Sequence, residues 1–270
     1  MDKIHIAECF GAAAAHYDEH AHVQQRILNW SFDNLSLNSA PMQSLDPNKQ
    51  FGRVVDLGCG TGNALLRLSA LADTVSAIDI AQPMLDYAQS RSNSVSNITY
   101  RCADFDALTA VFTPSSVDWV FSSMALQWSS SPEKVLADIS TILGPNGRAT
   151  LTILIAPSFA NLHQAWSVIG RGHAVNSFAS LTQWLEAAKC AGLSCTSQSA
   201  VFTDEYPDFL SMLHSIKDVG ASSAVAEPAD TPSSTMLTKR QFREACAAFL
   251  DCNNGVYSLD YHVVQLHLSS

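Results

Sequence analysis

The run VVDLGCGTGN at residues 54–63 constrains this chain more than any other feature of its sequence. An apolar stretch leads into Asp56, and Gly58, Gly60 and Gly62 follow at alternate positions before a helical pattern begins. Glycines at such a turn adopt positive φ and let the backbone approach a ligand closely. The run therefore predicts a buried strand that turns sharply into a helix, with a ligand site at the turn.

Strand and helix patterns alternate from this turn onwards. Helical periodicity follows it at residues 62–72, 82–92 and 132–143. Short runs rich in Val and Ile predict strands at residues 53–57, 74–80, 98–102, 117–123 and 149–156. Such strands between helices indicate a doubly wound α/β fold, a mainly parallel sheet covered on both faces.

Further segments flank this alternating region. We divide the chain into a helical arm at 1–35, a ligand-binding core at 50–156, helical lid insertions at 157–192 and 206–250, and final core strands at 193–205 and 256–268. Two polar stretches separate these parts, at 36–52 and 221–235, because clusters of Ser, Asn, Pro and Gly favour turns and linkers.

Charge and cysteine content exclude several classes of protein. Lys and Arg number 15 against 25 Asp and Glu, and this net charge of −10 disfavours binding to nucleic acid. No apolar run of about 18 residues predicts a membrane span, and polar Glu8 interrupts any signal-peptide pattern, so we expect a cytoplasmic protein. Seven scattered cysteines without a CxxC pattern predict reduced thiols, and His16 and His20 lack further ligands, so no metal is expected.

Three classes of ligand compete for the glycine turn. A Walker loop needs Gly-Lys-Ser/Thr, but residues 62–64 read Gly-Asn-Ala, which excludes it. A dinucleotide fingerprint needs its third glycine one residue later than Gly62, so NAD is the weaker alternative. S-adenosylmethionine carries an ammonium and a sulfonium beside its carboxylate, and an acidic residue on the first strand suits such a cationic ligand. The turn therefore favours S-adenosylmethionine.

Acidic residues follow three successive predicted strands. Asp56 ends the first and faces the methionine end of the cofactor in this interpretation. Asp79 ends the second, where a carboxylate accepts hydrogen bonds from both ribose hydroxyls. Asp104 follows the third and accepts the adenine amino group, with Phe105 against the ring. The alternative is that Asp79 and Asp104 only cap helices.

The run DLGCGTG at residues 56–62 resembles the motif of class I S-adenosylmethionine-dependent methyltransferases, and the resemblance spans about residues 50–156. It implies a Rossmann-like, seven-stranded doubly wound sheet whose last strand is antiparallel. It also implies cofactor contacts from Asp56, Gly58, Gly60, Asp79, Ile80, Asp104 and Phe105. To these we add Gln24, Cys59, Met84 and Ser122 as expected cofactor contacts.

Segments outside the core resemble the malonyl-acyl-carrier-protein O-methyltransferases of biotin synthesis. They occur in the same order at residues 9–26, 122–136, 161–178, 213–221, 236–242 and 255–264. This resemblance implies methylation of the free carboxylate of a malonyl thioester, on acyl carrier protein or coenzyme A, to give the methyl ester that primes a biotin precursor. Ala12 and Ser177 depart from the family, which often has basic residues there.

A carboxylate substrate needs no general base, since it is already ionised at neutral pH. Positioning is then the main requirement, and we expect Tyr17 on the arm to close over the methionine end, unless it is an ordinary core tyrosine. His163 and Trp166 are expected to wall the acyl pocket, although Trp166 also suits lid packing. Lys217 or Arg171 is expected to hold the substrate carboxylate.

Lys239, Arg240 and Arg243 form the densest group of cations in the sequence. We expect them to dock an acidic carrier protein, the alternative being an ordinary solvated helix face. Other functions stay open: methylation of another small carboxylic acid or of a quinone precursor, or a non-methylating assembly factor. Methylation at a quinone carbon requires a base near the exit of the fourth strand, and Ser122, Ser123 and Gln127 are poor bases.

Overall fold

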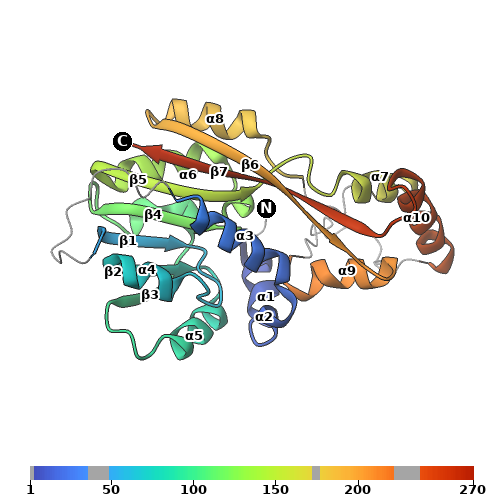
Figure 1. The fold of residues 1–270 in the computed structure, drawn as a ribbon, viewed down its shortest axis with the longest axis horizontal. Coiled ribbons are helices and arrows are strands. Elements are labelled where there is room, and N and C mark those ends of the chain that lie inside the picture. Colours follow the sequence, from blue (N-terminus) through green and yellow to red (C-terminus); the bar gives the residue numbers. More distant parts are fainter. Residues whose placement is uncertain (1–2, 36–48, 172–176, 222–237) are drawn as a thin grey trace.

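A computed structural model describes the chain except for residues 1–2, 36–48, 172–176 and 222–237. Its sheet has the order β3-β2-β1-β4-β5-β7-β6 (Figure 1). The strands are β1 (Phe51–Leu57), β2 (Ala72–Asp79), β3 (Ile98–Cys102), β4 (Val117–Ser123), β5 (Leu143–Leu154), β6 (Ser194–Glu205) and β7 (Ser258–Ser269). Pairing is parallel from β3 to β5, and β7 is antiparallel to both β5 and β6. The expected seven-stranded, mainly parallel sheet with an antiparallel last strand is confirmed.

Helices cover both faces of the sheet. On one face, α3 (His22–Asp33), α4 (Leu65–Leu71) and α5 (Gln82–Arg91) pack against a cluster that includes Val54. On the other, α6 (Pro132–Ile142) and α8 (Leu181–Cys190) pack against a cluster that includes Val55. Successive side chains of a strand point to opposite faces, so neighbouring residues of β1 feed the two clusters. The structure thus places α8 with the sheet, although it lies in the predicted lid segment 157–192.

Local sequence explains where several helices begin. Ser131 caps α6, accepting a hydrogen bond from the Lys134 backbone N–H at 3.3 Å, and Pro132 occupies the first turn. Capping boxes open α8 and α10 (Lys239–Cys252), the first through Ser180 and Gln183. In contrast, α4 starts later than the predicted 62–72, because the glycine turn extends to Ala64.

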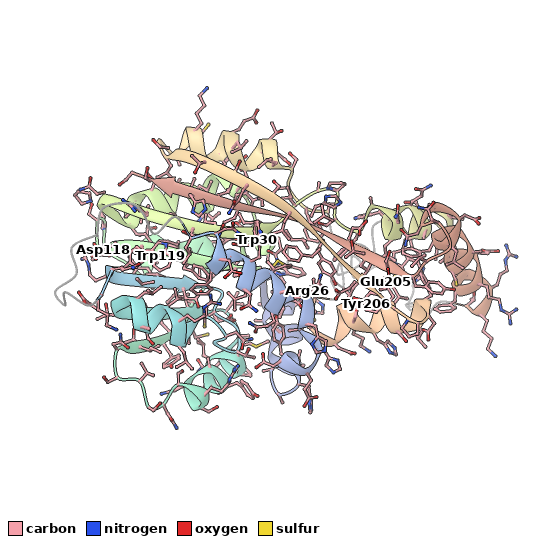
Figure 2. The ribbon with its side chains drawn as sticks, in the orientation of Figure 1. Arg26, Trp30, Asp118, Trp119, Glu205 and Tyr206 are labelled. Carbon is pink, nitrogen blue, oxygen red and sulfur yellow. The ribbon has the colours of Figure 1, made fainter. Side chains whose placement is uncertain are left out.

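The N-terminal arm consists of α1 (Lys3–Ala13), α2 (Tyr17–His20) and α3. Its last helix is anchored to the far end of β6, where Arg26 pairs with Asp204 and the rings of Trp30 and Phe202 meet at 6.0 Å. Figure 2 shows Arg26 close to Tyr206, beyond that end of the strand. The arm therefore bridges the core sheet and the projecting part of β6.

A helical lobe surrounds the projecting ends of β6 and β7. It contains α7 (Ala160–Val168), α9 (Phe209–Asp218) and α10, at the right of Figure 1. Phe209 lies at its centre, with the rings of Trp166 and Phe249 at 6.0 and 5.5 Å. The remaining short helices, η1 (Phe105–Ala110) and η2 (Leu126–Trp128), follow β3 and β4. None of the helices described here is long and apolar enough to cross a membrane. The predicted linkers 36–52 and 221–235 lie mostly outside the described residues.

Candidate active site

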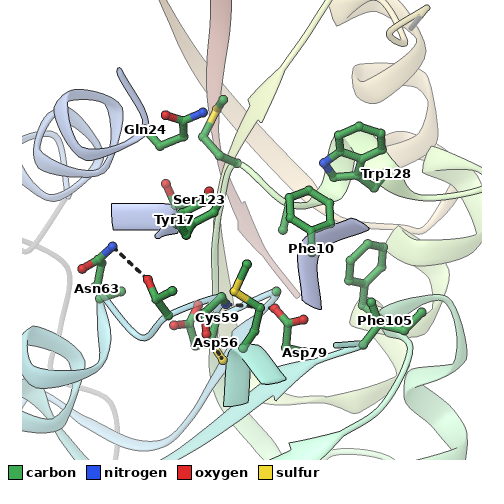
Figure 3. Close-up of a pocket in the computed structure, with 18 of the residues that line it drawn as sticks. Phe10, Tyr17, Gln24, Asp56, Cys59, Asn63, Asp79, Phe105, Ser123 and Trp128 are labelled. Atoms are coloured by element: carbon green, nitrogen blue, oxygen red, sulfur yellow. Dashed lines mark hydrogen bonds between the residues drawn. The ribbon is translucent and has the colours of Figure 1, made fainter. Parts of the chain in front are cut away.

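Two cavities adjoin at the carboxyl edge of the parallel strands. The first encloses about 950 Å³, counting its open mouth, and the second about 480 Å³. Figure 3 shows the first, with Tyr17 and Gln24 above Asp56 and Asp79. The residues that line both are Phe10, Tyr17, Gln24, Met124 and Trp128. The two spaces therefore communicate beneath the N-terminal arm.

The first cavity gathers the three acids expected from the strand ends. Asp56, Asp79 and Asp104 all line it, together with Phe105. The carboxyl ends of parallel strands meet at one sheet edge, so residues far apart in sequence converge there. Ile80, Met84, Cys59 and Gln24 also line this cavity, as expected.

The glycine turn is shaped as a cradle for a ligand. Gly58 has φ +69°, and a Cβ there would lie 2.2 Å from the Cβ of Ala125. Gly60 has φ +53°, yet a Cβ there would meet no atom within 4 Å, because it would project into open space. Close packing against Ala125 thus requires glycine at position 58. At position 60 the absence of a side chain leaves the adjoining space open for a ligand. A cofactor that lies against the backbone fits this arrangement.

Asp56 is the most unusual acid of the site. It is 2% exposed, and its Oδ2 accepts no hydrogen bond from any described residue. Burial, helped by the negative charge of Asp79, raises the pKa of Asp56 to about 8. A buried carboxylate oxygen without a partner is costly unless a ligand supplies a donor or a cation. The ammonium of S-adenosylmethionine fits that requirement.

Asp79 is held rigidly at the end of β2. Its two oxygens accept the backbone N–H groups of Ala81 and Gly60, each at 2.9 Å. Burial raises its pKa, and those hydrogen bonds oppose the rise. Each oxygen keeps a free lone pair, so both ribose hydroxyls of the cofactor can donate to this carboxylate.

The end of the first cavity near Asp104 holds a cation that the sequence interpretation missed. The Lys3 Nζ lies 3.3 Å from Asp104 and 2.8 Å from Asp106, and 4.5 Å from the centre of the Phe105 ring. Asp104 also caps η1 by accepting the Asp106 backbone N–H at 2.9 Å. Asp104 therefore caps a helix, as the alternative proposed, but it does not only cap, because it lines the cavity as well.

A clamp fastens the arm to the glycine turn. Asp18 accepts hydrogen bonds from Thr61 at 2.7 Å and from Asn63 at 2.9 Å, and it pairs with Arg91 at 2.6 Å. This places the adjacent Tyr17 over the cavity, where burial and the charges of Asp79 and Asp18 raise its pKa. The Tyr17 hydroxyl therefore stays protonated and can donate a hydrogen bond to a ligand.

The second cavity is mainly apolar and receives walls from distant segments. The lid segments contribute Phe159, Phe178, Ile216 and Val219, and strand β7 contributes Tyr261. Met124, which follows β4, adopts φ +57° and lines both cavities. A non-glycine residue in this conformation is strained, and such strain is common where function fixes a side chain.

Some expected site residues lie elsewhere. The structure corrects Ser122: it is fully buried and donates to the carbonyl of Leu57 at 2.8 Å, while Ser123 lines the cavity. None of the four substrate residues expected from the sequence lines either cavity: His163, Trp166, Arg171 and Lys217. Trp166 packs inside the lobe against Phe209, as its alternative interpretation proposed.

Lys217 shows why the substrate side was hard to predict. It is exposed, while its neighbours Ile216 and Val219 on the same stretch line the cavity. Each residue of a helix is rotated by about 100° from the last, so only the packing of α9 decides which of them points inward. The sequence interpretation also missed Phe10, Met124 and Trp128 as lining residues, although all three lie in the segments 9–26 and 122–136 that carry the family resemblance.

The cations expected to dock a carrier protein open α10. Lys239, Arg240 and Arg243 are all exposed, and Arg240 donates to Glu244 at 2.7 Å. Docking by this cluster stays a prediction. Over the part of the chain that the structure describes, no group of three or more His, Cys, Asp or Glu side chains could hold a metal ion.

Comparison with known proteins gives three results. Residues 55–151 match a family model described as a methyltransferase domain. A protein of Hahella chejuensis named malonyl-[acyl-carrier protein] O-methyltransferase is 32% identical over 267 residues, which covers 97% of this chain and 89% of the relative. The biotin biosynthesis bifunctional protein BioHC of Cellvibrio japonicus is 33% identical over 195 residues, 72% of this chain and 36% of the relative.

A solved structure shares the fold. The YcgJ protein of Bacillus subtilis superposes with a TM-score of 0.63 at 17% identity, covering 90% of this chain and 98% of that one. At this identity the likeness concerns the architecture alone.

Proposed function

The chain belongs to the malonyl-[acyl-carrier protein] O-methyltransferase family and is an S-adenosylmethionine-dependent methyltransferase, and from this premise we propose that it methylates the free carboxylate of malonyl-acyl carrier protein. The product is the malonyl methyl ester, which primes the synthesis of a biotin precursor. The name of the bifunctional relative supports the connection to biotin synthesis.

One observation carries this proposal on the structural side. A cavity lined by Asp56, Asp79 and Asp104 opens beside Tyr17 into a second, mainly apolar cavity. The acids suit a cationic methyl donor, and the second space suits an acyl group on a thioester. The reacting groups meet where the two cavities join.

The reaction requires alignment rather than proton transfer. S-adenosylmethionine, when bound, supplies a methyl group on a positively charged sulfur. That methyl group would be transferred to an oxygen of the substrate carboxylate, and S-adenosylhomocysteine would leave with the electron pair of the broken S–CH₃ bond on its sulfur. Asp56 and Asp79 hold the donor, and Tyr17 and the arm exclude water from the junction.

The assignments of individual residues remain proposals. We propose that Asp56, Gly58, Cys59, Gly60, Asp79, Ile80, Met84, Asp104 and Phe105 contact the cofactor. We retain the division into arm 1–35, core 50–156, lid segments and final strands as a functional description. Use of malonyl-coenzyme A and a cytoplasmic location are also proposals.

A turnover assay tests the function. S-adenosylhomocysteine release is measured with malonyl-carrier protein, malonyl-coenzyme A, free malonate and acetyl-carrier protein. We expect release with malonyl thioesters and none with acetyl-carrier protein, which lacks a free carboxylate. Release with free malonate alone indicates a small-acid methyltransferase, and no release with any substrate indicates a non-methylating relative.

A further inference from the structure

The passage between the two cavities contains uncharged polar groups. Beyond the shared residues, the polar side chains of the second cavity come from Gln127 and Tyr261. Among the described residues that line this cavity, none is Asp, Glu, Lys, Arg or His. A substrate carboxylate at the junction therefore meets no side-chain cation from the described walls of the second cavity.

Gln127 has its amide nitrogen occupied and its oxygen free. The Nε2 donates to the backbone carbonyl of Met124 at 2.7 Å, and this contact decides which end of the amide is nitrogen. The Oε1 is buried and accepts no hydrogen bond from any described residue. A buried acceptor without a donor lowers stability, so this atom is suited to a ligand that carries an N–H or O–H group.

Gln24 and Tyr17 offer unused capacity on the arm side. The Oε1 of Gln24 is buried without a partner, and within the described chain neither its Nε2 nor the Tyr17 hydroxyl donates a hydrogen bond. Both residues line both cavities. Because burial raises the pKa of Tyr17, its hydroxyl keeps the proton and can donate to an anion.

On the basis of the proposed function, we infer that uncharged donors, the Gln24 amide and the Tyr17 hydroxyl, hold the malonyl carboxylate, and that Gln127 Oε1 accepts the first amide N–H of the pantetheine arm. The junction is thereby a specificity site that recognises an anion without a cation. Gln24 and Tyr17 line both cavities, whereas Gln127 lines only the second, so the order of these groups follows the order along the substrate.

The chemistry of the reaction gives a reason for this choice. Methyl transfer to a carboxylate removes one negative and one positive charge, and a low-dielectric cavity favours such a step. A buried Lys or Arg would pair with the carboxylate before transfer and be left without a partner beside the neutral ester afterwards. An amide and a hydroxyl can hydrogen-bond to both the substrate and the product.

The test compares isosteric variants that remove one amide each. For Gln24→Met we expect the KM for malonyl-carrier protein to rise about 10- to 100-fold, as for a lost hydrogen bond to a charge. The affinity for S-adenosylhomocysteine, measured by calorimetry, should change less than about twofold. Gln89→Met, on the exposed side of α5, is the matched control and should change neither quantity.

The variant Gln127→Met separates recognition of the substrate's pantetheine group from recognition of its carboxylate. Its KM for malonyl-pantetheine should rise about 2- to 10-fold, as for a neutral hydrogen bond. Its KM for the S-ethyl thioester of malonate, which has no amide, should stay unchanged. An equal rise with both substrates would overturn the role of Gln127.

Two further outcomes would overturn the inference about the carboxylate. One is a Gln24→Met variant that loses S-adenosylhomocysteine affinity but keeps its KM for malonyl-carrier protein. The other is a larger rise in that KM for Lys217→Met or Arg171→Met than for Gln24→Met. Wild-type protein that releases no S-adenosylhomocysteine with any malonyl thioester contradicts the proposed function itself, so the two failures are distinguishable.

Discussion

The two cavities meet at Tyr17 but differ in charge and in construction. The first cavity is built mainly from strand ends and the turn that follows β1, with the arm over it, and it includes Asp56, Asp79 and Asp104. The second cavity is lined by the arm, the residues that follow β4, and the lid segments, which include α9. None of its described lining residues carries a formal charge. Among the described lining residues, charge is thus concentrated in the cavity proposed for a cationic ligand, and none lines the cavity proposed for the acyl group.

The difference also concerns rigidity. The cofactor side is fixed by backbone hydrogen bonds to Asp79 and by close packing at Gly58. The other side is held by side-chain contacts between segments, such as the clamp at Asp18. We therefore expect changes in the core to alter cofactor affinity and changes in the arm or lobe to alter turnover and substrate use.

Removing part of the arm should separate cofactor binding from turnover most strongly. Deletion of residues 1–20 removes α1 and α2 but keeps α3, whose Val23 and Ile27 are buried. Turnover should fall at least about 100-fold, because Tyr17 and the cover of the junction are lost. Steady-state rates are compared with those of the full chain, and circular dichroism checks the fold. A folded truncation with nearly full activity would contradict the role of the arm in turnover.

Asp79→Ala tests the cofactor side. The affinity for S-adenosylmethionine should fall about 10- to 100-fold, because a charged acceptor and the anchor of Gly60 are lost together. Calorimetry measures the change, with Asp86→Ala on the exposed side of α5 as control. Unchanged affinity in Asp79→Ala removes this residue from the cofactor site.

Asp56→Asn tests the cost of the buried charge. The pKa of Asp56 in the folded chain is about 8, against an ordinary value of 3.8, so between these pH values the folded state holds a proton that the unfolded state has lost. Its contribution makes the free energy of unfolding fall as pH rises across that window. Without cofactor, Asp56→Asn should be more stable than wild type by about 1 to 3 kcal/mol at pH 8 and similar at pH 4.

Urea unfolding at the two pH values measures this difference, and calorimetry shows the opposite effect on function. The same variant should bind S-adenosylmethionine more weakly at pH 8, since an amide cannot neutralise the ammonium. A variant that is no more stable than wild type at pH 8 contradicts the assignment of a buried, unpartnered carboxylate.

The arm clamp should produce a smaller effect. Asp18→Asn weakens the pair with Arg91, in which both side chains are partly exposed, at 29% and 42%. Release of S-adenosylhomocysteine should become about 2- to 5-fold faster, as expected for loss of a partly screened ion pair. Stopped-flow fluorescence measures the rate, and Asp33→Asn at the exposed end of α3 is the control. Equal rates in Asp18→Asn and wild type would show that the clamp does not limit release.

Charge reversal on α10 should have the smallest effect. Arg243→Glu should raise the KM for malonyl-carrier protein about 2- to 4-fold at low salt and leave malonyl-pantetheine unaffected. Arg243 is a better site for this substitution than Arg240, because Arg240 already pairs with Glu244. The control is Lys189→Glu, an equal change of charge at an exposed residue of α8. An equal effect of both variants indicates general repulsion between two acidic proteins and no docking at α10.

The cofactor side was predictable because its signals are local. A strand, a glycine turn and the next strand can each be identified from neighbouring residues, and parallel strands bring Asp56, Asp79 and Asp104 to one edge. The same reasoning failed by one position at Ser122, where Ser123 lines the cavity. Lys3 carried no local signal, since its partners Asp104 and Asp106 lie a hundred residues away.

The sequence by itself determined the α/β class, the strands, the glycine turn and the acids that follow the strands, because hydrophobic period and glycine conformation act over a few residues. Only the tertiary structure decided which residues line the second cavity. Its walls come from the arm, the lid and α9, and side chains one position apart on a helix face opposite environments. The packing of α9 selected Ile216 over Lys217, so Lys217, one of the two cations that the sequence suggested, is not among the described residues that line this cavity.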